Sequence, residues 1–261
     1  MKILHTADWH LGHQLHGHER RFEHDAFLDW LTDTIKQRQI DALLVAGDLF
    51  DTANPPASAW QQLYRFLARL RAEMPRLNMV LIGGNHDSPS KLDAPHELLR
   101  AFDLHLVGSI SRDSDGRLET DRLLVPLQDR EGKIAAWCAA VPFLRSSDLR
   151  VEQLEEGQDR LIEGVRQIYQ DVLAQGRTRC EPGQALIAMG HAYLAAGQLS
   201  ELSERRVLGG NQHALPADIF AAADYTALGH LHLAQSPAEG VHYSGSPLPL
   251  SLAEANYNHR V

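Results

Sequence analysis

Five strand-like segments of the chain each end in side chains that can bind a metal ion, and this pattern restricts the fold more than any other feature. They end in the sequences ADWH, GDLFD, GNHD, GH and GHLH, and four of these endings begin with glycine, which lets the backbone turn sharply. Ligands of open α/β sheets bind beyond the carboxyl ends of the strands, so we expect these side chains to gather at one edge. The side chains concerned are Asp8, His10, Asp48, Asp51, Asn85, His86, Asp87, His191, His230 and His232.

The types of these side chains restrict the metal. They are carboxylates, imidazoles and one amide, without a thiolate, and this set suits Mn²⁺, Fe²⁺ or Zn²⁺. Seven of them are candidate ligands, which is too many for one tetrahedral ion. The set suits two ions about 3.5–4 Å apart that share a carboxylate. The seven candidates are Asp8, His10, Asp48, Asn85, His191, His230 and His232.

The first third of the chain alternates between two kinds of segment. Strand-like runs at 2–7, 41–47 and 78–84 are separated by segments 20–39 and 57–74, in which apolar side chains recur at helical spacing. This β-α-β-α-β order predicts a parallel sheet with helices packed on it.

The rest of the chain predicts a second sheet. Strand-like runs at 104–108, 121–128 and 133–142 are separated by short polar turns, and an amphipathic helix follows over 157–176. We see neither an internal repeat nor a linker, so we expect residues 1–261 to form one α/β domain built from two sheets. The last expected strands are 184–191, 224–232 and 241–247.

Composition excludes some classes of protein. The formal net charge of −9 argues against binding of nucleic acid by bulk positive charge. Bound divalent cations would reverse the local field, so an enzyme that acts on phosphate esters stays open. Cys138 and Cys180 lack metal-site spacing, and the chain shows neither a signal peptide nor an apolar run long enough to span a membrane. We therefore expect a cytoplasmic protein with reduced thiols and no membrane association.

The series of motifs resembles that of the calcineurin-like metallophosphoesterases in order and spacing over essentially the whole chain. The flanking sequences, such as VAGDLFDTANPP, DYTALGHLH and YSGSPLPLSLAEANYN, resemble those of the bacterial SbcD family of nuclease subunits. This resemblance implies an α/β fold in which a two-sheet β-sandwich is flanked by helices, the αββα arrangement of the metallophosphoesterases.

The resemblance also implies roles for individual residues. Asp48 would be shared by two ions, and His86 would face the scissile phosphate, where it stabilises charge or protonates the leaving oxygen. Asp51 would reach the other ring nitrogen of His86 and fix its tautomer. Asp8, His10 and His232 would complete the site of one ion, and Asn85, His191 and His230 that of the other.

The activity implied by the resemblance is that of a Mn²⁺-dependent DNA nuclease, which uses two metal ions to activate a bridging water. Such nucleases act as duplex exonucleases and as endonucleases on single strands and hairpins, in DNA repair, recombination and replication. The implied partners are DNA, an SbcC-type ATPase and a second copy of the chain, bound through the early helices. We also expect the C-terminal capping and partner-binding regions of the family to be absent from this chain.

Two other functions stay open at this point. A phosphodiesterase for small nucleotides, or a phosphatase, would have the same metal site. A docking module for a partner ATPase, with catalysis secondary, would have the same surface motifs.

The remaining aromatic and charged residues receive structural interpretations. We expect His5 to be buried and hydrogen-bonded, Trp9 to pack beneath the site and Asp87 to hold its turn. For His24, a surface position and a role near the site both stay open. The aromatic side chains expected in the core are Phe22, Trp30, Tyr64 and Phe66. The histidines expected to be structural or on the surface are His96, His105, His213, His242 and His259.

Overall fold

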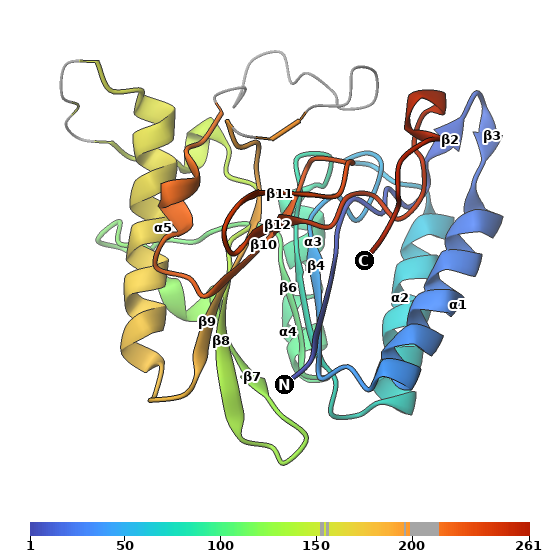
Figure 1. Cartoon of the computed structure of the whole chain (residues 1–261), viewed down its shortest axis with the longest axis horizontal. Coiled ribbons are helices and arrows are strands. Elements are labelled where there is room, and N and C mark those ends of the chain that lie inside the picture. The colour runs from blue at the N-terminus through green and yellow to red at the C-terminus, as the bar shows by residue number, and fades with distance from the viewer. Residues whose placement is uncertain (152–153, 155–156, 196, 199–213) are drawn as a thin grey trace.

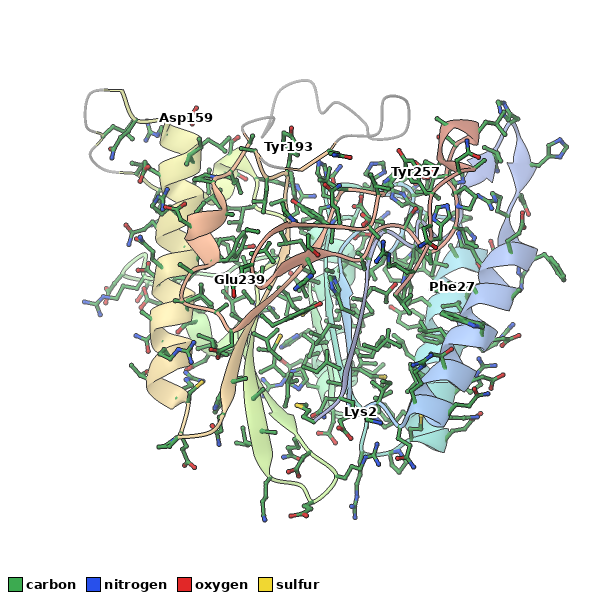
Figure 2. All side chains as sticks on the ribbon, viewed as in Figure 1. Lys2, Phe27, Asp159, Tyr193, Glu239 and Tyr257 are labelled. Carbon is green, nitrogen blue, oxygen red and sulfur yellow. The ribbon has the colours of Figure 1, made fainter. Side chains whose placement is uncertain are left out.

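Two β-sheets pack face to face between two layers of helices in the computed structural model of the chain (Figure 1). The structure describes residues 1–151, 154, 157–195, 197–198 and 214–261, so His213 lies outside the described residues. Side chains fill the space between the sheets (Figure 2). This arrangement confirms the predicted two-sheet α/β fold with helices on both outer faces.

The first sheet is parallel and has the strand order β1-β4-β5-β6. Helices α1 and α2 cover its outer face, as the β-α-β-α-β pattern predicts. The segment 104–108 was expected in the second sheet, but its strand β6 joins the first one, because two short helices form a crossover that returns the chain parallel to β5. The elements of this half are β1 (Ile3–Thr6), α1 (Arg21–Arg38), β4 (Ala42–Ala46), α2 (Ala57–Glu73), β5 (Asn78–Ile82), α3 (Pro89–Asp93), α4 (His96–Arg100) and β6 (Leu104–Val107).

Strand β4 shows how this sheet is held in the core. Leu43 and Val45 pack among the side chains of the helices, whereas Ala42, Leu44 and Ala46 belong to the cluster between the two sheets. All five side chains are fully buried, so the strand has two apolar faces. A continuous apolar run is typical of a parallel strand that is covered on both sides.

The second sheet is mixed and has the strand order β11-β12-β10-β9-β8-β7. Its four central strands are parallel to one another, and the two outer strands pair antiparallel. Helix α5 packs on its outer face (Figure 1). The elements are β7 (Leu124–Gln128), β8 (Ile134–Ala140), α5 (Arg160–Arg179), β9 (Ala185–His191), β10 (Tyr225–Gly229), β11 (Gln235–Ala238) and β12 (Val241–Tyr243). A small hairpin, β2 (Gln14–Leu15) and β3 (His18–Glu19), precedes α1.

Helix α5 begins where its sequence provides a cap. The carboxylate of Asp159 accepts hydrogen bonds from the backbone N–H groups of Leu161 and Ile162, which would otherwise lack partners at the start of the helix.

None of the helices in the described part of the chain combines the length and apolarity needed to cross a membrane.

The prediction that four helical aromatic residues lie in the core is correct for only one of them. Phe66 is 3% exposed, but Phe22 is 82%, Trp30 51% and Tyr64 37% exposed. Each helix lies on the sheet with one face only, and on α1 that face carries Phe27, Leu28, Leu31 and Ile35. The other aromatic side chains therefore point away from the sheet.

Candidate metal centre

Both sheets direct their carboxyl ends to one end of the molecule. Lys2, just before β1, lies at the lower end in Figure 2, whereas Tyr193, just after β9, lies at the upper end. The segments that follow β1, β4, β5, β9 and β10 therefore meet at the upper end. They bring together all seven candidate ligands. Five of the seven ligands are buried, with at most 4% of the residue exposed: Asp8, His10, Asp48, His191 and His232.

Several of the candidate ligands have a backbone conformation that non-glycine residues seldom adopt. The φ angles are 55° at Asp8, 48° at His10, 48° at Asp48 and 100° at His230. Such conformations cost about 1–3 kcal/mol each and cluster at functional sites. They turn the chain abruptly after the strands, so that adjacent side chains can face one centre.

The glycines that precede the ligands serve close packing. A Cβ atom at Gly47 would overlap the ring of His191, and one at Gly84 would overlap the carboxylate of Asp48. The sequence analysis expected these glycines to allow sharp turns of the backbone, and Gly47 does have a positive φ of 92°. At Gly84 the requirement is space, since Asp48 occupies the place where a side chain would lie.

Asp48 stands between two groups of ligand atoms. Its Oδ2 lies 3.6 Å from Nε2 of His10 and 3.4 Å from Nε2 of His191. On the first side, ligand atoms of Asp8, His10 and His232 lie within 4.8 Å of one another. On the second side, Oδ1 of Asn85 lies 2.8 Å from Nε2 of His191 and 3.0 Å from Nδ1 of His230. Ligand atoms of Asp8, Asp48 and His191 also lie within 4.8 Å of one another, so the two halves of the centre adjoin at the carboxylates of Asp48 and Asp8.

Hydrogen bonds at one ring nitrogen turn the other toward the centre in two of the histidines. Nδ1 of His191 donates to the carbonyl oxygen of Ala46 at 2.9 Å, and Nδ1 of His232 lies 2.8 Å from Oε1 of Glu254. Metal-bound histidines are oriented in the same way. In addition, buried Nε2 of His10 makes no hydrogen bond to any described residue. An unsatisfied buried nitrogen is costly, and a metal ion would satisfy it, so the donor set fits a bound cation.

The charges of the site also fit a cation. Burial lowers the pKa of His10 to about 4 and that of His230 to about 3, so both rings are neutral at pH 7 and keep a free lone pair. Burial raises the pKa of Asp8 to about 6. Although burial opposes it, the neighbouring His191 holds the pKa of Asp48 well below its usual value. The carboxylates are thus mainly ionised at neutral pH.

His86 lies beside the centre without being enclosed by it. One of its ring nitrogens lies within 4.8 Å of ligand atoms of His10 and Asp48, and the residue is only half-buried. Its Nδ1 donates to the backbone carbonyl oxygen of Asp51 at 2.7 Å, which leaves Nε2 as the nitrogen that can exchange a proton with a substrate. The backbone N–H of His86 donates to Oδ1 of Asp48 at 2.9 Å, which ties the residue to the centre.

Asp51 does reach Nδ1 of His86, as expected, but through its backbone carbonyl and not through the expected carboxylate. The carboxylate instead lies 3.3 Å from Nδ1 of His10, and it is the backbone carbonyl of Asp51 that holds His86. The tautomer of His86 is therefore fixed by main-chain geometry. We therefore expect a substitution of the Asp51 side chain to leave this bond in place.

Asp87 holds the turn after β5, as the sequence analysis expected. Its two carboxylate oxygens accept backbone N–H bonds from Leu49 at 3.1 Å, Phe50 at 3.0 Å and Gly84 at 2.8 Å. These bonds join the loops that carry Asp48 and His86, so Asp87 supports the centre without facing it.

We expect Asp87→Asn to destabilise the fold by about 1–3 kcal/mol, because an amide group would leave one of the three buried N–H donors without an acceptor. The measurement is urea unfolding in the presence of a chelator, with Asp33→Asn on the exposed face of α1 as the matched control. Equal unfolding midpoints for the two variants would contradict this role of Asp87.

Glu254 is a buried carboxylate that the sequence analysis did not single out. It is fully buried on the 3₁₀ turn Leu252–Glu254 and contacts His232, 22 residues earlier in the chain. The motif series ends at His232, and spacing alone does not connect the two residues. Only the three-dimensional arrangement identifies this partner.

The structure shows where two other histidines, His5 and His24, lie relative to the site. His5 is buried and bonded to the hydroxyl of Tyr225 and the carbonyl oxygen of Leu228, as expected. His24 is fully buried, and its Nε2 donates to the carbonyl oxygen of Trp9, so the surface position left open for it is wrong. Trp9 itself is buried against Phe27 and Phe66. His24 and Trp9 therefore support the loop that presents Asp8 and His10.

We expect metal binding to strengthen as pH rises from 7 to 9. Burial lowers the pKa of His191, but the nearby carboxylates of Asp48 and Asp8 outweigh burial and raise it to about 9. The metal-free protein thus holds a proton on this ring at pH 7, and an ion must displace it. Apparent affinity should rise by up to about tenfold per pH unit until His191 is neutral.

Calorimetric titration with Mn²⁺ in two buffers of different ionisation enthalpy measures this proton directly. About one proton should be released per protein molecule at pH 7, and fewer at pH 9. His10 and His230, which are already neutral, contribute none. Equal affinity at both pH values, without proton release, would contradict the raised pKa of His191.

Comparison with known proteins gives matches along the chain. The family model for calcineurin-like phosphoesterases matches residues 1–234. The chain is 45% identical over 267 residues to the SbcD subunit of the nuclease SbcCD from Rhodobacter capsulatus, covering 100% of this chain and 65% of that protein. It is 36% identical over 261 residues to the subunit of the same name from Escherichia coli K12, covering 97% of this chain and 62% of that protein.

The chain thus spans less than two thirds of the length of these relatives. Among solved structures, it is similar to a dimetal phosphatase from Danio rerio, with a TM-score of 0.46 and 13% identity, over 92% of this chain and 84% of that one.

Proposed function

Because the chain belongs to the calcineurin-like phosphoesterase family, we propose that it is a metal-dependent phosphodiesterase that hydrolyses DNA. In this proposal it acts as a duplex exonuclease and as an endonuclease on single strands and hairpins, in the processing of DNA ends during repair. The choice of DNA is supported by its relatives, which are named as subunits of a nuclease.

One observation carries the proposal. Asp48 lies between two sets of nitrogen and oxygen ligands that come from both sheets, with its Oδ2 3.6 Å and 3.4 Å from the facing nitrogens of His10 and His191. A carboxylate shared between two sets of ligands is the arrangement that paired divalent cations need in hydrolysis of phosphate esters.

The chain's own residues divide into two ion sites in this proposal. Asp8, His10 and His232 hold one ion, and Asn85, His191 and His230 hold the other, with Asp48 common to both. When bound, such ions activate water and offset the negative charge of the phosphate group. We propose Mn²⁺ for both sites, since the ligands are carboxylate, amide and imidazole groups.

His86 acts on the phosphodiester itself. It is half-buried beside the centre, and the carbonyl oxygen of Asp51 fixes the proton of Nδ1. Nε2 therefore faces the substrate and, when protonated, can donate a hydrogen bond to a phosphate oxygen or a proton to the leaving oxygen. The fixed ring orientation removes the cost of positioning this group in the transition state.

The proposed partners are DNA, an SbcC-type ATPase and a second copy of the chain. The relatives are named as one subunit of a complex, which supports a partner protein. The exposed aromatic side chains Phe22 and Trp30 on α1 and Tyr64 on α2 support a homodimer through these helices. Light scattering at increasing concentration measures that association.

A cytoplasmic location is supported by the unpaired thiols of Cys138 and Cys180.

The test of the proposed function is hydrolysis of an end-labelled hairpin duplex with Mn²⁺, with Mg²⁺ and with a chelator. A chromogenic phosphodiester and a chromogenic phosphomonoester are assayed under the same conditions. We expect cutting of the hairpin with Mn²⁺, less with Mg²⁺ and none with chelator. Turnover of the small esters without cutting of DNA would overturn DNA as the substrate, and no turnover of any substrate would overturn the enzymatic function.

A further inference from the structure

The segment that follows β12 returns to the metal centre and places a carboxylate behind one ligand. Glu254 is fully buried, and its Oε1 lies 2.8 Å from Nδ1 of His232. Its other oxygen, Oε2, accepts the backbone N–H of Leu250 at 2.7 Å. Burial of a charged carboxylate is unfavourable unless its oxygens accept hydrogen bonds, and these two contacts provide a partner for each oxygen of Glu254.

Four contacts hold this segment, residues 244–259, in place. The backbone N–H of Ser246 donates to the carbonyl oxygen of His232 at 3.1 Å, and the guanidinium of Arg20 donates to the carbonyl oxygen of Pro249. The ring of His259 lies 2.8 Å from the carbonyl oxygen of Ser246 and 3.2 Å from that of Glu254. The position of Glu254 is thus set by contacts at both ends of the segment.

The two halves of the centre differ in what orients their histidines. In one half, a neutral backbone carbonyl, that of Ala46, accepts from His191. In the other half, the acceptor at His232 is a carboxylate. A charged acceptor makes a stronger bond and increases the basicity of the ring nitrogen that faces the metal.

We propose that Glu254 is a positioning residue, which holds the Nδ1–H tautomer of His232 and thereby strengthens one of the two ion sites, the one formed with Asp8 and His10. The inference rests on the two-ion centre proposed above and assigns no contact between Glu254 and the substrate. The family match ends at residue 234, so the residue that supports this site comes from the part of the chain beyond the matched region.

The test compares Mn²⁺ binding to the unmodified chain, to Glu254→Gln and to Glu239→Gln, by calorimetry and by electron paramagnetic resonance. Glu239 lies in the turn between β11 and β12, away from the ligands, so its variant controls for loss of one carboxylate. We expect Glu254→Gln to bind one of two ions about 10–100-fold more weakly, with the other unchanged. The control should bind both ions as the unmodified chain does.

A second readout is independent of metal. Two-bond ¹H–¹⁵N correlation spectra of the metal-free protein report the tautomer of His232, and Glu254→Gln should reduce the population with a proton on Nδ1. Circular dichroism in chelator establishes whether the variant is folded. If Glu254→Gln is unfolded, Glu254→Asp keeps the buried charge but shortens its reach, and the same loss at one site is expected.

The outcomes separate the inference from the proposed function. Unchanged affinity at both sites and an unchanged tautomer in a folded variant would overturn the role of Glu254. Because these are measurements of binding and of spectra, they hold even if the chain fails to cut DNA, which would overturn only the nuclease function. If the unmodified chain binds no ion, both the metal centre and the role of Glu254 are overturned.

Discussion

Asp48→Asn is expected to weaken the binding of both ions and to abolish hydrolysis. The variant keeps the size of the side chain, but it removes the charge that lies within 3.6 Å of ligand nitrogens on both sides of the centre. Loss of an outer partner of a ligand costs about 10–100-fold in metal affinity, so loss of a shared ligand should cost more than about 100-fold. In the proposed division each of the other ligands holds one ion, so its loss should affect mainly the binding of that ion, although Asp8 also lies within 4.8 Å of a ligand atom of His191.

The experiment is a Mn²⁺ titration followed by turnover of a chromogenic phosphodiester, with Asp33→Asn as the control for a change of charge. His191→Gln serves as a comparison, since we expect it to weaken the binding of one ion only. The metal-free variants should remain folded by circular dichroism. If Asp48→Asn retained one ion at full affinity, Asp48 would belong to a single site, and the arrangement with a shared carboxylate would be incorrect.

The fold could be predicted from the sequence where an element is covered on both faces. Strands β4 and β5 are continuous apolar runs, and their assignment to a parallel core sheet is confirmed. The position of β6 could not be predicted, because an apolar strand of four residues fits either sheet and the crossover through α3 and α4 decides between them. Helical spacing likewise placed Phe22 and Trp30 in the core, although the helix buries only its opposite face.

The site could be predicted where its residues follow strands directly. Most of the ligands come within a few residues of a strand end, and parallel strands bring such positions together regardless of the loops between them. The supporting contacts could not be predicted in this way. The acceptor at His86 is a backbone atom, which no residue type reveals, and the acceptor at His232 arrives from a turn that follows another two strands.

His86→Gln is expected to retain both ions and to lose turnover by about 100- to 10,000-fold, the range of general acid–base catalysis. His86 belongs to neither half of the proposed centre, and its ring is held from outside by the carbonyl oxygen of Asp51. Glutamine can still donate a hydrogen bond to a phosphate oxygen, but it cannot transfer a proton. The variant thus separates the two roles that the resemblance left open for this residue.

The substrate decides what the loss of turnover means. A diester with a nitrophenolate leaving group needs little protonation, whereas a DNA 3′-oxygen needs much more. If His86 protonates the leaving oxygen, both His86→Gln and His86→Ala should lose far more activity on the hairpin than on the chromogenic diester. An equal loss on the two substrates in His86→Ala, with a smaller loss in His86→Gln, would instead assign His86 to charge stabilisation. His18→Gln, in the exposed hairpin before α1, is the matched control. Full activity of His86→Ala on both substrates, with both ions bound, would remove the residue from the reaction, and hydrolysis would then have to proceed without a protein acid beside the centre.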